Sequence, residues 1–195
     1  MIRLACLILA ALFLGACATK PMAERDPASE FMVNLATHCG QAYAGRLVSS
    51  DPQDADFVGE AMVMHVRSCA EDEIRVPFHV SEDRSRTWVI SRTDGGLRLK
   101  HDHRHEDGEE DVITQYGGDA LVFDTAERIA FPVDAYSIDL FNREGLTASI
   151  TNIWALELTE TVFAYELRRS SRYFRVEFDL TQPVTPPPAP WGAAG

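Results

Sequence analysis

Apolar and polar residues alternate along most of the chain, and this period of two predicts β-strands. In one segment Ile74, Val76 and Phe78 would face one way while Arg75 and His79 face the other. The same pattern predicts strands at 43–49, 57–68, 74–80, three within 86–116, then 120–124, 129–133, 137–141, 147–158, 162–168 and 173–180.

Each clearly alternating strand has one polar face, which excludes a parallel α/β sheet, and the connectors are too short for crossover helices. The chain therefore predicts an all-β fold, an antiparallel meander of roughly ten strands. We expect closure into a barrel, because a sheet of that size with one apolar face curls until its edges meet; a sandwich is the alternative. Asp26-Pro27 should begin a short helix that ends at Gly40 and precedes the meander.

A short helix followed by an antiparallel meander resembles, in architecture, the calycin group of lipocalin-like barrels. The Gly-x-Trp signature of lipocalins does not stand in the first strand, which reads Tyr43-Ala44-Gly45-Arg46. The resemblance therefore implies a calycin-like barrel and no particular ligand.

The amino terminus has the pattern of a secretory signal: a basic start up to Arg3, then an apolar run over 4–14 that is too short to span a bilayer. The run ends in Leu14-Gly15-Ala16-Cys17, which resembles the lipobox of bacterial lipoproteins. The resemblance implies that 1–16 is a signal peptide and that Cys17 carries the lipid. Because Ala18 follows the cysteine, it also implies a lipid anchor in the outer membrane, facing the periplasm. An ordinary secretory signal is the alternative.

With Cys6 removed and Cys17 lipidated, Cys39 and Cys69 remain. In an oxidising compartment such a pair is most simply a disulfide. Two free thiols acting as metal ligands are the alternative.

The remaining organisation is simple. A lipidated tether, 17–25, leads to one domain, 26–180, which is long enough for a single core. The residues 181–195 are rich in Pro and Ala and predict a disordered or polyproline II tail. The formal net charge of -12 argues against nucleic-acid partners, which bind basic patches.

Two Asp-Gly pairs, at 94–95 and 107–108, divide the segment 86–116 into three predicted strands, since Asp-Gly favours the type I′ turn of a hairpin. The apolar face of these strands runs on into histidines. With two-residue loops the pairs are Arg92–Leu97, Ile90–Leu99, Trp88–His101, Arg86–His103, His105–Glu110, His103–Val112, His101–Thr114 and Leu99–Tyr116.

The candidate ligand-binding residues share the histidine face: Arg86, Trp88, His101, His103 and Tyr116. Arginine binds carboxylates or phosphates through its two-pronged donors. Arg86 could instead belong to the solvated turn at 81–85. The histidines could also form a rim strand that hydrogen-bonds water and acids.

A metal site is the competing interpretation, with His103, His105 and Glu110 as ligands of zinc or another divalent cation. The sequence His103-Arg104-His105, followed by Glu110 and Gly117, is similar to the later part of the first cupin motif. Cupins are metal-binding barrels, but Leu97 stands where that motif has its glycine. No nucleophile with a base and no glycine-rich phosphate loop is recognisable.

Three functions follow. The first is a non-catalytic envelope lipoprotein that binds a small amphiphilic or anionic molecule in its barrel. The second is a cupin-like metal-binding protein or enzyme, and the third is a structural envelope protein.

Overall fold

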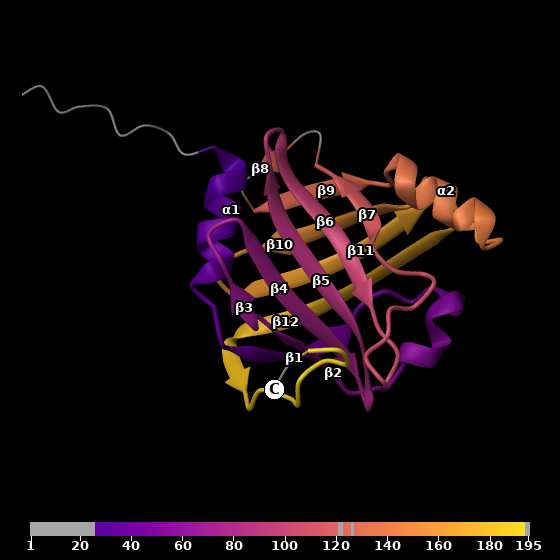
Figure 1. Ribbon diagram of the computed structural model, residues 1–195. Coiled ribbons are helices and arrows are strands. Elements are labelled where there is room, and N and C mark those ends of the chain that lie inside the picture. Colours follow the sequence, from indigo (N-terminus) through magenta and orange to yellow (C-terminus); the bar gives the residue numbers. More distant parts are fainter. Residues whose placement is uncertain (1–25, 121–122, 126, 194–195) are drawn as a thin grey trace, which may run out of the picture.

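The computed structural model describes residues 26–120, 123–125 and 127–193, so the predicted signal peptide, Cys17 and tether lie outside them. Within the described residues, twelve strands form one antiparallel sheet that is nearly closed into a barrel, accompanied by a few short helices (Figure 1). This confirms the predicted all-β fold with its short amino-terminal helix. None of the described helices has the length and apolar character needed to cross a bilayer.

The helices are α1 (Pro27–Ala36), η1 (Pro52–Phe57), α2 (Ala135–Arg143) and η2 (Thr147–Thr151). The strands are β1 (Ala42–Leu47), β2 (Met62–His65), β3 (Ser68–Cys69), β4 (Glu73–Val80), β5 (Asp83–Thr93), β6 (Gly96–His103), β7 (Tyr116–Asp119), β8 (Phe123–Thr125), β9 (Arg128–Pro132), β10 (Ile153–Leu158), β11 (Val162–Arg169) and β12 (Arg172–Val184).

The strands follow the order β7-β6-β5-β4-β2-β1-β12-β11-β10-β9-β8, and β3 pairs with β4. In Figure 1, β4, β5 and β6 cross in front of β10, β11 and β12. The barrel approaches closure where β7 meets the end of β9: the Asp134 amide donates to the Gly117 carbonyl at 3.0 Å. A Cβ on Gly118 would lie 1.7 Å from the Pro132 oxygen, so only glycine permits this approach.

One end of the barrel is filled by α1. Asp26 caps the helix by accepting from the Ala28 amide, and Pro27 occupies its first turn. Phe31 and Leu35 are fully buried and belong to the barrel core. We call this the closed end.

The predicted disulfide is confirmed. Cys39 and Cys69 are bonded, with their Cα atoms 6.2 Å apart. The bond joins the chain just after α1 to β3, so these thiols are not free metal ligands.

Three of the predicted strands are wrong in whole or in part. Residues 137–141 belong to α2, where Asp134 caps the Ser137 amide and Leu140 and Phe141 are buried. Residues 147–151 form η2, and the strand begins only at Ile153. In α2 the buried residues Ser137, Leu140 and Phe141 are spaced three and four apart, as on one face of a helix. In η2, Ala148 and Ile150 alternate with polar residues as they would in a strand, and neither is buried. Likewise 57–68 is a strand only over β2 and, as a short piece, β3.

The last strand extends beyond the predicted end at Leu180 to Val184. The chain then lies over the outer face of the sheet rather than extending away from it. The Trp191 amide donates to the Arg84 carbonyl at 3.1 Å, and the Arg84 side chain donates to the Ala189 carbonyl at 3.2 Å. Part of the predicted tail is therefore attached to the barrel.

The first Asp-Gly turn sets the register as predicted: Trp88 opposes His101 and Arg86 opposes His103. The second does not. Beyond His103 there is only an isolated bridge between Arg104 and Glu110, and the next strand, β7, pairs His101 with Tyr116 rather than with Thr114.

This shift of two residues has a local cause. The Asp111 carboxylate accepts from the Ile113 amide, and Gln115 adopts a positive φ of 56°, so the chain folds into a loop before β7. An even shift keeps Tyr116 on the histidine face. Val112, predicted on that face, is instead 63% exposed.

Candidate functional site

The end of the barrel opposite α1 contains a cavity of about 110 Å³. We call it the mouth chamber. It is lined by Phe57, Phe78, Arg86, Trp88, His101, His103, Tyr116, Tyr165, Leu167, Arg172 and Phe174. All five residues predicted as ligand-binding are among them, and none of the described residues that line the chamber is a carboxylate.

The strand period brings these side chains together. His101 and His103 continue the inward face of β6 after Leu97 and Leu99, which are fully buried. On β12, Arg172 continues the inward face of Phe174 in the same way. Polar side chains thus replace apolar ones only where the strands reach the mouth.

Aromatic rings form the floor of the chamber. Trp88 stacks on Phe78 on one side and on Tyr165 on the other, with ring centroids 4.9 and 4.5 Å apart. A second stack joins His101 to Tyr116 at 4.5 Å. These rings make the floor of the chamber apolar, which suits an apolar ligand group.

His101 has both ring nitrogens satisfied. Its Nδ1 lies 3.1 Å from the Tyr116 carbonyl, which can only accept, so Nδ1 carries the proton. Its Nε2 therefore accepts from the Tyr165 hydroxyl at 2.8 Å. Burial, with a smaller contribution from His103, lowers the pKa of His101 to about 3. The imidazole is neutral at physiological pH.

His103, Tyr116 and Tyr165 are neutral as well. His103 Nε2 lies 3.1 Å from the Tyr116 hydroxyl. Burial, and then the charge of Arg86, lower the pKa of His103 to about 4. Burial raises the pKa of Tyr116 to about 12 and that of Tyr165 well above its ordinary value.

The formal charges in the lining belong to two guanidinium groups. Arg86 donates to Asp83 at 2.6 Å from within β5, so it does not lie in the predicted solvated turn. Arg172 is paired with Asp54 of η1. Asp83 and Asp54 are not among the described residues that line the chamber, so the formal charges of the lining itself are the two guanidinium charges.

The metal-site residues are not brought together. His105 lies beyond the end of β6 with a side chain 57% exposed, and its Nε2 is 3.9 Å from Asp111. Glu110 accepts from Arg104 and Gln115 instead. Among the described residues, no three His, Cys, Asp or Glu side chains are grouped as a metal centre.

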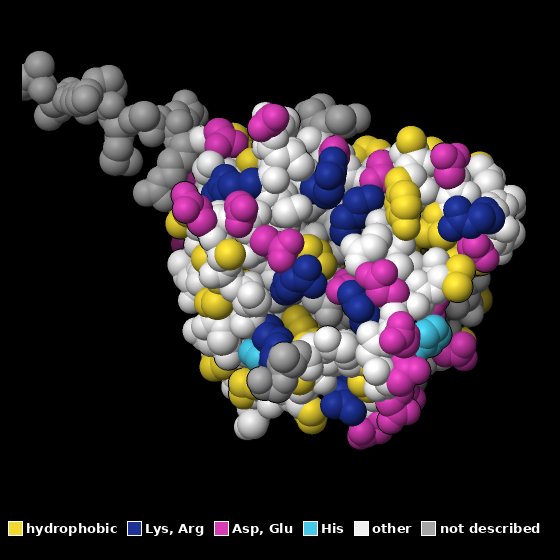
Figure 2. All heavy atoms as spheres, viewed as in Figure 1, with side chains coloured by type: hydrophobic (Ala, Val, Ile, Leu, Met, Phe, Trp, Pro, Cys, Tyr) yellow, Lys and Arg dark blue, Asp and Glu magenta, His cyan; other side chains and the backbone are white. Residues whose placement is uncertain are grey.

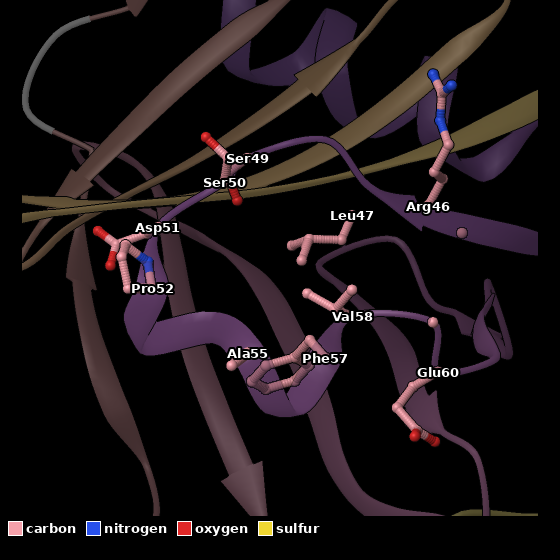
Figure 3. Close-up of a pocket in the computed structure, with 12 residues that line it drawn as sticks. Arg46, Leu47, Ser49, Ser50, Asp51, Pro52, Ala55, Phe57, Val58 and Glu60 are labelled. Atoms are coloured by element: carbon pink, nitrogen blue, oxygen red, sulfur yellow. The ribbon is translucent and has the colours of Figure 1, made fainter.

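A second hollow, of about 530 Å³, lies on the outer side of η1. In Figure 3, Leu47, Phe57 and Val58 gather in its middle, and Ser49, Ser50 and Asp51 lie along one edge. We call it the η1 groove. Phe57 lines both the groove and the mouth chamber, so η1 is the wall between them.

The outside of the mouth is acidic. The loop between β6 and β7 carries the exposed Glu106, Asp107, Glu109 and Glu110. Figure 2 shows Asp and Glu side chains gathered on the side of the molecule where this loop lies. The positive lining of the chamber therefore contrasts with its surroundings.

Sequence reasoning missed Arg172, Tyr165 and Phe57. The alternation of Phe174, Val176 and Phe178 extends back by two residues to Arg172. The predicted strand begins at 173 and therefore leaves Arg172 out. Tyr165 follows Phe163 on the inward face of β11 in the same way. No sequence pattern would have placed Phe57, whose helix η1 lies across the mouth through tertiary contacts.

Comparison of the chain with models of known families, with characterised proteins and with solved structures gives no match.

Proposed function

We propose that the protein is a non-catalytic envelope lipoprotein whose barrel binds a small anion with a flat apolar body in the mouth chamber. The observation that carries this proposal is the lining. In a chain of net charge -12, the described residues that line this cavity bring two guanidinium groups, no carboxylate and an aromatic floor.

The chemistry of the lining supports an amphiphilic anion. Arginine can hold a carboxylate or phosphate by two parallel hydrogen bonds. The packed rings of Trp88, Phe78 and Tyr165 provide an apolar surface for the apolar body of the ligand. A cavity of about 110 Å³ limits the buried part to about the size of one ring.

Benzoate is a suitable probe, and benzyl alcohol is its neutral control. By isothermal titration we expect benzoate to bind with a dissociation constant of about 1 mM or lower. Arg86→Gln should weaken benzoate at least fivefold and leave benzyl alcohol unchanged. Equal affinity for the acid and the alcohol would remove the anion-binding proposal.

The lipid anchor is part of the same proposal. Cys17 stands at the end of an apolar run behind small residues, as in the lipobox. We propose that it holds the protein on the periplasmic face of the outer membrane, where several acyl chains anchor stably. Cys17→Ser should abolish labelling by a fatty-acid analogue and release the protein from membranes. Unchanged labelling and fractionation would contradict the anchor.

A metal-dependent function is not favoured, since His103, His105 and Glu110 engage other partners. No specific observation favours a purely structural role.

A further inference from the structure

The helix η1 is fastened over the mouth by a buried ion pair. Asp54 is fully buried, and its Oδ1 accepts from the Arg172 guanidinium. The pairing is incomplete: Asp54 Oδ2, Arg172 Nε and the nearby Arg169 Nε are buried and have no hydrogen-bond partner among the described residues. Unpaired buried polar atoms are unfavourable, so this junction is poorly satisfied.

The other attachments of η1 all lead to β11, β12 and the hairpin between them. Gln53 donates to the Ser171 carbonyl at 3.3 Å, and Asp51 accepts from the Tyr173 amide at 3.3 Å. Phe57 packs edge-on against Phe174, with centroids 5.2 Å apart. Gln53 also accepts from the Arg169 guanidinium at 3.2 Å, and all three hydrogen bonds are at or beyond the long end of the usual range.

The backbone of η1 also departs from a regular helix. Asp54 has φ of -103° and ψ of 15° within it, and Gly59 follows it with φ of 84°. Gly59 gives the chain a conformation that favours glycine at the point where η1 joins the next segment.

We propose that the ligand of the mouth chamber is a carboxylate, and that its carboxylate replaces Asp54 on Arg172 so that η1 opens as a lid. This rests on the proposed function. Asp54 shows which anion Arg172 accepts: a planar group with two oxygens and one negative charge, which matches the guanidinium fork. An exchange of one carboxylate for another keeps the charge of the junction constant.

The exchange also moves the Asp54 carboxylate from a buried position into water. Burial raises the pKa of Asp54 despite the opposing effect of Arg172, so its ionised form gains from release into water. Because Phe57 separates the chamber from the η1 groove, displacement of η1 would join the two spaces.

The test compares Asp54→Asn with the matched control Asp56→Asn, an exposed carboxylate of the same helix. Removing the internal competitor should tighten benzoate binding about tenfold, while the control should leave it unchanged. The lid proposal would be overturned if the folded Asp54→Asn variant bound benzoate no more tightly than the parent does. Failure of the parent to bind benzoate would instead remove the proposed function.

A second measurement uses the unaltered chain and does not depend on how well the variant folds. Hydrogen exchange of the backbone amides at 53–58 should become faster on addition of saturating benzoate, because η1 loses its contacts with β12. Unchanged or slower exchange in the bound protein would overturn the lid, since η1 would then stay in place or close over the ligand.

Discussion

The two ends of the barrel differ in the kind of side chain that is buried there: apolar at the closed end, and partly charged at the mouth. At the closed end, α1 contributes Phe31, Met32 and Leu35 to the core, and each of them is at most 3% exposed. At the mouth, η1 covers the barrel with a buried ion pair that leaves polar atoms unpaired, and Phe57 is its aromatic contact. Both helices lie across the ends of strands, yet only one completes an apolar core.

Under the proposed function, this difference separates the residues that stabilise the fold from those that bind the ligand. Apolar burial at the closed end stabilises the folded state without requiring any partner. Polar and charged groups at the mouth cost free energy when buried, and a protein retains them most readily where they bind something. Substitutions at the two ends should therefore change different properties.

The largest effect on stability is expected at the closed end. Phe31→Ala removes a fully buried ring and should lower the free energy of unfolding by about 3–5 kcal/mol. Urea denaturation followed by circular dichroism measures this. Benzoate affinity at a temperature where the variant is folded should stay within twofold of the parent. A loss of binding with little loss of stability would contradict the division between the ends.

Loss of the disulfide should come next. A loop of 30 residues between Cys39 and Cys69 predicts a stabilisation of roughly 3–4 kcal/mol from loop closure. The double change Cys39→Ser, Cys69→Ser should lower the free energy of unfolding by that amount and spare binding at the mouth. Calorimetry of the oxidised parent and the double variant provides the comparison. Equal melting temperatures would contradict this prediction.

The mouth should make stability depend on pH. The pKa of His101 is about 3 in the folded state, against an ordinary value of 6.5. Between these two pH values the unfolded chain binds a proton at His101 and the folded chain does not. Stability is therefore fully present above pH 6.5 and is lost as the pH falls toward 3. At pH 5 the loss is about 2 kcal/mol for this residue.

His101→Gln tests that slope, because glutamine is neutral and still forms hydrogen bonds. Denaturation curves at pH 7 and pH 5 should differ less in the variant than in the parent by about 2 kcal/mol. If the parent were equally stable at both values, His101 would not be buried in its neutral form.

The smallest effect is expected outside the chamber. His105→Ala removes an exposed side chain and should change the free energy of unfolding by less than about 0.5 kcal/mol. Zinc should not bind through His105, and it should therefore leave the melting temperatures of the parent and the variant unchanged. A zinc-dependent rise in the parent that His105→Ala abolishes would restore the metal interpretation.

Much of the mouth chamber could be predicted from the sequence because of a single turn. Asp94-Gly95 fixes the register of β5 and β6, and the strand period then puts Arg86, Trp88 and His103 on one inward face. The loop after β6 could not be foreseen, because it depends on the Asp111 side chain and on the positive φ of Gln115.

The fold class could likewise be predicted, since it needs only alternation and short connectors. α2 was missed because its buried residues are few and close together. The ion pair between Asp54 and Arg172 joins residues 118 apart in the sequence, and no local pattern in either segment predicts it. Long-range ion pairs of this kind become visible only in the folded chain.

The most direct test of the account is chemical-shift mapping of the isotope-labelled soluble domain during a titration with benzoate. Binding in the mouth chamber predicts that the largest shifts occur at the Trp88 indole, the His101 and His103 rings and the amides of η1. Residues of α1 at the closed end should not respond. Shifts concentrated away from the mouth, or none at a concentration of several millimolar, would contradict the assignment of the mouth chamber as the binding site.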